Sequence, residues 1–164
     1  MSEELTIRRC NLENVYDREQ LFSLLNRYAA DPMGQNKQLD VDSDELLNGL
    51  RKCPNCHTLF AVSNKRPVGL CIAFQNFSTF EARPLMNIHD LIVDEKYRNK
   101  GIAGKLLNEI ESIAIAKNCC KLTLEVRDDN IIAQALYKNF NFIETEPRML
   151  FWVKHIWEAK HETN

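Results

Sequence analysis

Residues 88–126 limit the fold most narrowly, because they alternate between strand and helix patterns. Residues 88–93 form a β-rich run, and residues 121–126 alternate apolar and polar side chains with period two. Between them, residues 101–117 place one apolar face at helical spacing, formed by Ile102, Leu106, Ile110, Ile113 and Ala114. Two strands joined by one helix normally run parallel in the same sheet. The segment therefore predicts an α/β protein with at least one parallel strand pair.

The flanking segments extend this unit into a larger mixed sheet. Asp42 and Glu45 have the spacing of a capping box at the start of a helix, and Asn64 to Pro67 suit a hairpin turn. The other expected elements are strands at 5–9, 59–63 and 68–77, helices at 14–30 and 131–139, and a last hairpin of strands 141–145 and 150–154. The predicted order is β-α-α-β-β-β-α-β-α-β-β, an α/β (α+β) fold with a mixed sheet of six to seven strands and about four helices.

Length and composition indicate one domain, residues 1–164, with no strong charge preference. The chain of 164 residues is 45% hydrophobic and has a formal net charge of −2, which gives no overall attraction to nucleic acid or to an anionic membrane. The acidic start lacks the pattern of a signal peptide, and no run reaches the ~20 apolar residues of a membrane span. We therefore expect a cytoplasmic protein whose six cysteines are free thiols.

Residues 91–105 carry the clearest chemical signal. An apolar strand enters a basic loop, and the loop opens the helix at 101–117. The start of a helix presents unpaired N–H groups and the positive end of its dipole. Gly101 allows close approach of the backbone to a ligand, while Arg98, Lys100 and Lys105 supply positive charge. The segment is typical of a pyrophosphate-binding loop.

Spacing decides which kind of phosphate loop this is. Asn99 and Leu106 stand where a Walker A loop needs Gly and Ser or Thr, and the glycines do not form the G-x-G-x-x-G fingerprint of dinucleotide-binding folds. The loop does match Arg-x-x-Gly-x-Ala, from Arg98 to Ala103. It resembles the acetyl-CoA loop of the GNAT superfamily of N-acyltransferases, whose pattern is Gln/Arg-x-x-Gly-x-Gly/Ala.

Two neighbouring segments strengthen the resemblance, which covers about residues 68–153. Residues 91–93 resemble the fourth strand of that family, and residues 130–142 resemble its Asn-x-x-Ala-x-x-Leu-Tyr-x-x-x-Gly-Phe helix and turn. Asn141 stands where the family has Gly, and Asn tolerates the left-handed conformation required there. The resemblance implies a GNAT fold, a homodimer, no metal, and acetyl-CoA as cosubstrate. The implied acetyl-CoA contacts are Leu91, Ile92, Val93, Arg98, Asn99, Lys100, Gly101, Ile102, Ala103, Gly104, Lys105, Asn130, Ala133 and Tyr137.

The same resemblance suggests catalytic roles. Tyr137 matches the usual general acid, although proton transfer from a phenol to a thiolate is uphill by roughly 2 kcal/mol at their free pKa values. The base is open between His89 and Asp90, which align with a Glu-Asp pair of polyamine acetyltransferases. Neighbouring residues on a regular strand face opposite sides of the sheet, so at most one of the two is expected to face the acceptor. A β-bulge at this position would be the exception. Glu125 is a further candidate.

The acceptor is expected to be a small-molecule amine, with a polyamine-like compound as the leading hypothesis. Residues 75–84 precede the fourth strand and contain aromatic rings and an acid, which together bind alkylammonium groups. An acetyltransferase for a peptide or protein amine is an alternative. A different class of alternative is a CoA-binding regulatory module that has lost turnover.

Cys53-Pro54-Asn55-Cys56-His57 competes with this interpretation. The segment fits the C-x-x-C-H pattern of c-type haem attachment, and C-x-x-C supplies half of a zinc site. No second pair of ligands at zinc spacing follows, so a proline turn with free thiols is the main interpretation.

Overall fold

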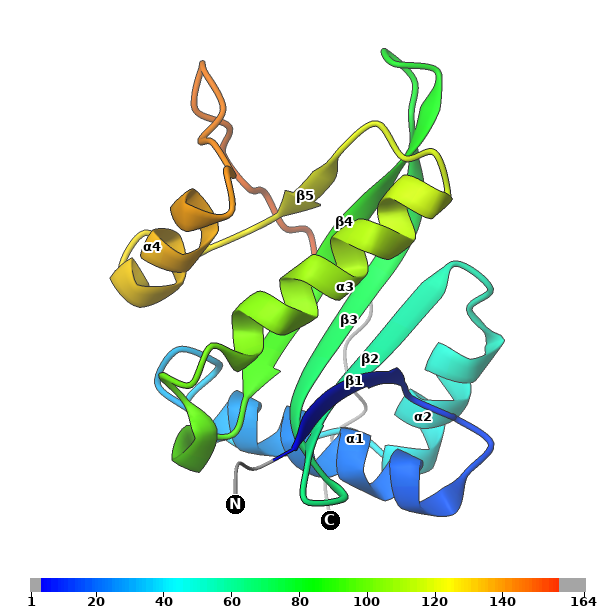
Figure 1. Ribbon diagram of the computed structural model, residues 1–164. Helices are drawn as coiled ribbons and strands as arrows, with labels where there is room; N and C mark the ends of the chain where they lie inside the picture. The colour runs from blue at the N-terminus through cyan, green and yellow to red at the C-terminus, as the bar shows by residue number, and fades with distance from the viewer. Residues whose placement is uncertain (1–3, 157–164) are drawn as a thin grey trace.

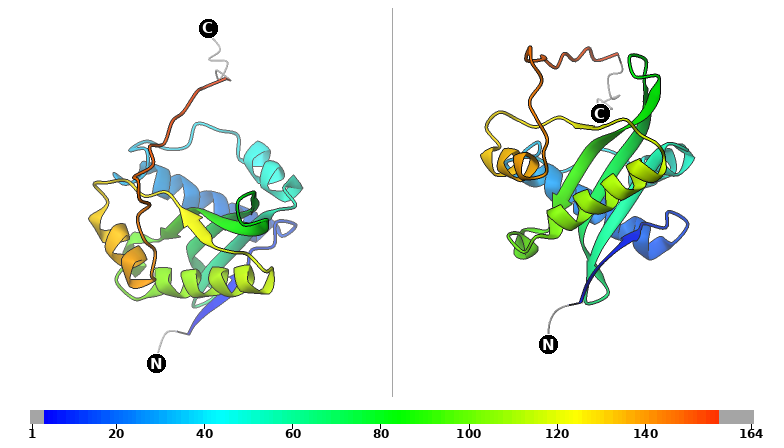
Figure 2. Two further views of the ribbon diagram at one scale, coloured as in Figure 1. Left: turned by 90° about the horizontal axis from the view of Figure 1, so that it is seen from above. Right: turned by 45° about the horizontal axis from the view of Figure 1, so that its top comes forward.

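The computed structural model describes residues 4–156 and shows a five-stranded sheet with helices on both faces. Helix α3 covers one face, and α1 and α2 cover the other (Figures 1 and 2). The elements are β1 (Leu5–Arg9), α1 (Val15–Ala30), α2 (Ser43–Lys52), β2 (Cys56–Ser63), β3 (Arg66–Ser78), β4 (Arg83–Val93), the 3-10 helix η1 (Glu95–Tyr97), α3 (Ile102–Ala116), β5 (Leu122–Leu124) and α4 (Ile131–Asn139).

The sheet order is β1-β2-β3-β4-β5, and every neighbouring pair is antiparallel except β4 and β5. The predicted parallel pair, joined by α3, is therefore confirmed. Strands β3 and β4 begin earlier than predicted and form a long hairpin with its tip near residues 79–82. Strand β5 is shorter than the predicted 121–126, because only three residues pair with β4.

Two apolar clusters lie on opposite faces of the sheet. One packs α3 against the sheet, with Leu106, Leu107 and Ile110 almost fully buried. The other packs α1 and α2 against the opposite face through residues such as Leu21, Leu24 and Leu47. Gly69 on β3 permits the close contact of α3, since a Cβ there would lie 3.1 Å from the Ile102 side chain. Both faces of the central strands are consequently covered.

Local signals correctly placed several helix ends. The Asp42 side chain accepts a hydrogen bond of 2.8 Å from the Glu45 backbone N–H, as the first half of a capping box requires. Asn118 has a φ of 55° just after α3, and Asn141 has a φ of 60° after α4. Both asparagines adopt the left-handed conformation that ends a helix, so the departure from Gly at 141 is structurally accommodated.

The predicted last hairpin, strands 141–145 and 150–154, is wrong for this structure. Residues 140–156 contain no strand, and the sheet has five strands within residues 4–156 instead of six to seven. Figures 1 and 2 show this segment leaving α4 as an extended chain that stands away from the sheet. The run 149–153 is apolar at every position, so it needs cover on both faces, and its own chain provides none.

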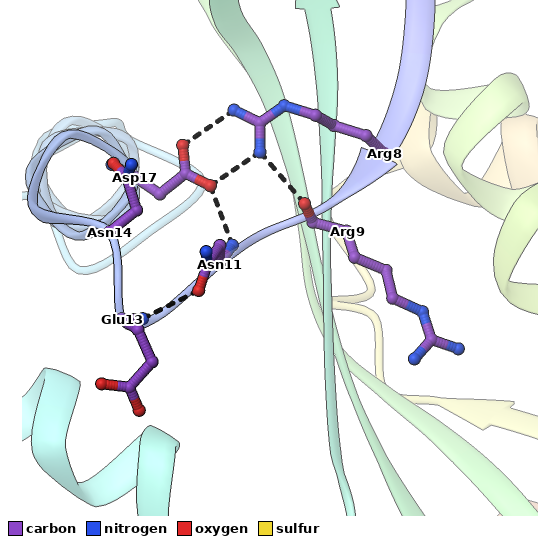
Figure 3. Close-up of polar contacts among 6 residues, drawn as sticks. All are labelled: Arg8, Arg9, Asn11, Glu13, Asn14 and Asp17. Carbon is purple, nitrogen blue, oxygen red and sulfur yellow. Dashed lines mark hydrogen bonds and ion pairs between the residues drawn. The ribbon is translucent and has the colours of Figure 1, made fainter.

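Strand β1 is tied to α1 by a buried carboxylate. Asp17 is 4% exposed, and its two oxygens accept hydrogen bonds of 2.6 and 2.7 Å from the Arg8 guanidinium (Figure 3). The Asn11 backbone N–H donates a third, at 2.8 Å. The Arg8 contact, followed by the Asn11 N–H, holds the pKa of Asp17 below its usual value against the opposing effect of burial. The Asp17 carboxylate thereby links β1, the turn after it and the first turn of α1.

We predict that Asp17→Ala lowers the free energy of unfolding by about 3 kcal/mol, because it leaves a guanidinium and a backbone N–H without their acceptor. Urea unfolding at neutral pH measures the change. The depressed pKa of Asp17 also implies that its stabilisation is present above the unfolded-state pKa of about 3.9 and is lost as pH falls through the folded value.

The matched control is Glu13→Ala, which removes the exposed ion pair of Glu13 and Arg51 at 3.1 Å. Exposed pairs of this kind contribute about 0–1 kcal/mol. Equal losses for the two variants would show that the Asp17 carboxylate has no special structural role.

Candidate active site

Strands β4 and β5 separate after a short contact. Met86, Asn87 and Ile88 pair with Leu122, Thr123 and Leu124, and the ladder then stops. Within residues 4–156, residues 89–93 of β4 have no strand partner on the side of β5. Figure 1 shows β5 diverging from β4 toward α4. The separation leaves unpaired strand backbone beside the start of α3, including the predicted contact residues 91–93. We call this gap between β4 and β5 the opening.

A β-bulge lies at the point of separation. The register with β3 places Ile72 opposite Asp90 but Ala73 opposite Ile88, so His89 is the extra residue. Asp90 shares the face of Ile72, and the His89 ring makes an edge contact with Phe74 at 5.8 Å. Ile72 and Phe74 both belong to the cluster beneath α1 and α2. His89 and Asp90 therefore face the same side, the exception that the strand argument allowed.

The two bulge residues differ in environment. His89 is exposed, whereas Asp90 is half-buried. Burial raises the pKa of Asp90 above that of an ordinary aspartate, and the neighbouring His89 opposes the rise. A carboxylate with a raised pKa is a stronger base than one in water, so Asp90 is chemically suited to accept a proton or to hold an ammonium group.

Tyr137 lies on α4, the helix that follows the diverging strand β5. Its ring packs edge-on against Phe142 at 5.7 Å and contacts the core beneath α3. Burial raises the pKa of Tyr137 to about 12, and the nearby Tyr28 and Cys71 side chains add to the rise. The phenol is therefore fully protonated at neutral pH. Relative to a thiol near pKa ~8.5, proton transfer from this phenol is uphill by about 5 kcal/mol, so a thiolate must be strongly desolvated to receive it.

Sequence reasoning missed the contribution of α1. Burial raises the pKa of Tyr28, with the negative charges of Asp90 and Asp31 adding to it and Arg127 and Arg98 opposing it. The Tyr28 phenol thus shares one electrostatic environment with Asp31 at the end of its own helix and with residues from three other segments. Tyr28 lies in the last turn of α1, outside every motif that the sequence offered.

The loop before α3 is shaped to admit an anion. Asn99 and Gly101 have φ angles of 61° and 73°, and no side chain caps the helix at Gly101. A Cβ at Gly101 would have nothing within 4 Å, so the loop is open on this side. The first-turn N–H groups of α3, from Ile102 onward, lack intrahelical acceptors. This combination suits a phosphate, as predicted for the acetyl-CoA loop.

Two other loop residues have structural functions in this arrangement. A Cβ at Gly104 would lie 2.9 Å from the Phe140 ring, so Gly104 allows α3 to pack closely against the end of α4. The Lys100 ammonium lies 5.1 Å from the centre of the Tyr97 ring, a cation-π distance. Lys105 is exposed on the first turn of α3.

The Arg98 side chain is held by contacts within the protein. Its Nε donates to the Val93 carbonyl at 3.1 Å, and its terminal nitrogen forms an ion pair with Asp31 at 2.8 Å. The Arg98 contact, followed by the Met33 N–H, lowers the pKa of Asp31. Arg98 thereby fastens the end of α1 to the end of β4. Its predicted contact with a cofactor phosphate remains a prediction.

The start of α4 is fixed by two predicted residues. The Asn130 side chain accepts a hydrogen bond of 3.1 Å from the Ala133 N–H, which is an N-cap. The same turn is closed by Gln134, whose side chain donates to the carbonyls of Arg127 and Asp128. Asn130 and Ala133 thus position α4, and with it Tyr137.

The cysteine segment borders this part of the sheet, since Cys56 pairs with Phe74, whose ring contacts His89, but it lines a separate hollow. A hollow of about 260 Å³ is lined by Cys10, Cys53, Cys56 and His57 among others, but by none of the β4 bulge residues or Tyr137. Burial raises the pKa of Cys10 to about 12 and that of Cys56 to about 11, which disfavours thiolate. In residues 4–156, no group of three or more His, Cys, Asp or Glu side chains is arranged to hold a metal ion. The same stretch contains no helix long and apolar enough to cross a membrane.

Comparison with known proteins agrees with this geometry. Residues 19–142 match the family model described as Acetyltransferase (GNAT) family. A thialysine N-epsilon-acetyltransferase from Bos taurus is 31% identical over 106 residues, covering 58% of this chain and 62% of that enzyme. An aminoglycoside N(6')-acetyltransferase type 1 from Acinetobacter genomosp. 13 is 25% identical over 135 residues, covering 77% of this chain and 92% of that enzyme.

Among solved structures, an aminoglycoside N-acetyltransferase in complex with CoA superposes with a TM-score of 0.75 at 16% identity, covering 94% of this chain and 97% of that one. At this identity the likeness concerns the fold. The family model spans about three-quarters of the sequence and includes the diverging strands, the loop before α3 and α4. The chain belongs to the GNAT acetyltransferase family.

Proposed function

We propose that the protein is an N-acetyltransferase that moves an acetyl group from acetyl-CoA directly to a primary amine of a small molecule. The observation that carries the proposal is the separation of β4 and β5 beside the uncapped start of α3, with Asp90 on β4 and Tyr137 on α4 both near the Tyr28 side chain. Relatives named as thialysine and aminoglycoside acetyltransferases support an amine acceptor.

Each part of the opening has a distinct task in this proposal. The amides at the start of α3 and the loop around Gly101 bind the pyrophosphate, and the free backbone of residues 91–93 aligns the extended arm of the cosubstrate. Tyr137 gives its proton to the departing thiolate, while an N–H near Ile92 stabilises the oxyanion. Asp90 holds the acceptor ammonium and takes its proton, and His89 orients the acceptor at the exposed entrance.

Release of free thiol from acetyl-CoA across a panel of amines tests the proposal as a whole. The panel includes polyamines, lysine-like amino acids, aminoglycosides and a peptide with a free N-terminus. Turnover that depends on one class of amine identifies the acceptor. Binding of CoA without release of thiol with any amine would favour a regulatory module over an enzyme.

We predict that Tyr137→Phe lowers kcat by about 10²–10³-fold with little change in KM for acetyl-CoA, because it removes only the proton donor. Since the pKa of Tyr137 is raised to about 12, the wild-type rate should show no loss of activity from this group below about pH 11. Tyr16→Phe, at an exposed tyrosine near the start of α1, is the matched control. Unchanged kcat in Tyr137→Phe would remove the acid role.

We predict that Asp90→Asn lowers kcat/KM for the amine by about 10²-fold or more and abolishes the acidic limb of its pH profile. The base must be deprotonated, so wild-type activity is lost as pH falls through the raised pKa of Asp90. His89→Gln should alter KM for the amine while the acidic limb persists. If the limb disappears in His89→Gln and survives in Asp90→Asn, the two assignments exchange.

We predict that Gly101→Ala raises KM for acetyl-CoA by about tenfold while kcat changes little. The φ of 73° strains an alanine, and its Cβ would occupy the open side of the loop. Gly49→Ala is the control, because Gly49 lies inside α2 and a Cβ there would have nothing within 4 Å. The control should keep its KM and gain about 0.5–1 kcal/mol of stability. Equal KM values in both variants would place the phosphate elsewhere.

A further inference from the structure

Cys53 and Cys56 lie at the two ends of one tight turn. The Cys56 backbone N–H donates a hydrogen bond of 3.1 Å to the Cys53 carbonyl, and neither Pro54 nor Asn55 between them has a positive φ. This combination, with proline at the second position, is typical of a type I turn, whose end Cα atoms lie less than about 7 Å apart. A disulfide needs Cα atoms roughly 4.4–6.8 Å apart, so the backbone permits one here.

The turn is held at both ends by the rest of the fold. The Cys53 N–H donates to the Leu50 carbonyl at 3.1 Å as the C-cap of α2, and the Asn55 carbonyl accepts from the Gln75 N–H of β3 at 2.9 Å. Cys56 is itself the first residue of β2. The two cysteines are therefore in place before any bond forms between them, which lowers the conformational entropy that the bond costs.

The two cysteine side chains share one space. Both are free, half-buried thiols, and both line the hollow of about 260 Å³ between the end of α2 and the start of β2. Burial first, and the Cys53 thiol next, raise the pKa of Cys56 to about 11, as expected for neighbouring sulfur atoms. Arg9 and Arg51 line the same hollow, so it suits a small disulfide that carries negative charge.

The other cysteines near this turn or near each other have less suitable geometry. The Cys10 N–H donates to the Thr58 carbonyl at 3.0 Å, so Cys10 lies opposite Thr58 and diagonal to Cys56. Diagonal neighbours on antiparallel strands are about 7–8 Å apart, beyond the usual disulfide range. Cys119 and Cys120 are adjacent in sequence, and Cα atoms about 3.8 Å apart fall short of that range.

We propose that Cys53 and Cys56 form a dithiol site that closes to a disulfide by exchange with a small anionic disulfide of the glutathione class. The Cys53 thiol loses its proton and attacks one sulfur of the reagent, whose S–S bond breaks, and the released small thiol gains a proton. Cys56 then loses its proton and attacks the Cys53 sulfur, and the second small thiol leaves and is protonated. One S–S bond replaces another, and two S–H bonds pass from the protein to the reagent. The proposal does not depend on acetyl transfer.

The order of the two attacks follows from burial. A raised pKa leaves little Cys56 as thiolate at neutral pH, and the thiolate is the attacking species. Cys53 is therefore the attacking thiol, and Cys56 is the resolving thiol. Once closed, the disulfide joins the end of α2 covalently to the start of β2.

The first test treats the folded protein with glutathione disulfide, alkylates the remaining thiols and maps the cysteines by mass. Trypsin cleaves after Lys52 and Lys65, and the peptide between these sites contains Cys53 and Cys56 as its only cysteines. This peptide should lose about 2 Da, the mass of two hydrogens, while the circular dichroism of the protein stays unchanged. The adjacent cysteines 119–120 are the internal control and should form no bond to each other.

The second test uses single substitutions to check the order of attack. Cys56→Ser should stop at the mixed disulfide, so the chain gains the mass of one glutathione unit at residue 53. Cys53→Ser should react at residue 56 about tenfold more slowly, because that thiol is rarely ionised. Cys10→Ser is the matched control and should close the turn disulfide at the wild-type rate. Equal rates in the first two variants would contradict the assigned order.

Three results would overturn the proposal. The first is a folded wild type in which Cys53 and Cys56 both stay free, or both carry glutathione, when the exchange has reached equilibrium. The second is a bond from Cys56 to Cys10, which appears as two cross-linked tryptic peptides. The third is a disulfide that forms only in urea, which would mean that the folded turn does not allow it.

Discussion

The limited pairing of β4 with β5 determines the position of the candidate active site. α3 connects the two strands in one crossover, so its start must lie at the end of β4 and beside the gap that opens there. The ladder stops at Ile88 and Leu124, immediately before the bulge at His89. Three features therefore meet at the end of the ladder: the free strand backbone, the uncapped start of α3 and the side chains of the bulge. The connection of strand, helix and strand is enough to place them together.

The electrostatics of the opening follow from the same arrangement. Asp90 and Tyr137 are both shielded from water, which raises both pKa values and keeps the phenol protonated at neutral pH. Tyr28 and Asp31 add charged or polar groups from the end of α1, and the ion pair of Asp31 with Arg98 joins this end to the loop before α3. A substrate bound in the opening would thus contact groups whose protonation depends on how α1 packs on the sheet.

Local chemistry explains what the sequence could predict. The α3 stripe, the Asp42 cap and the asparagine helix ends depend on neighbouring residues, and all are correct in the structure. The bulge at His89, the short length of β5 and the raised pKa of Tyr28 depend on segments far apart in the sequence. The hairpin at 141–154 failed for the same reason, because an apolar, β-rich run predicts a strand but does not identify its pairing partner.

The shortness of β5 keeps the candidate active site open. A longer β5 paired along all of β4 would close the gap in which acetyl-CoA is proposed to bind, yet a three-residue strand is weakly held at the edge of a sheet. α4 is instead held at its two ends, by the Asn130 cap and by the close packing of Phe140 against Gly104 of α3, so the gap and a firm support for α4 coexist.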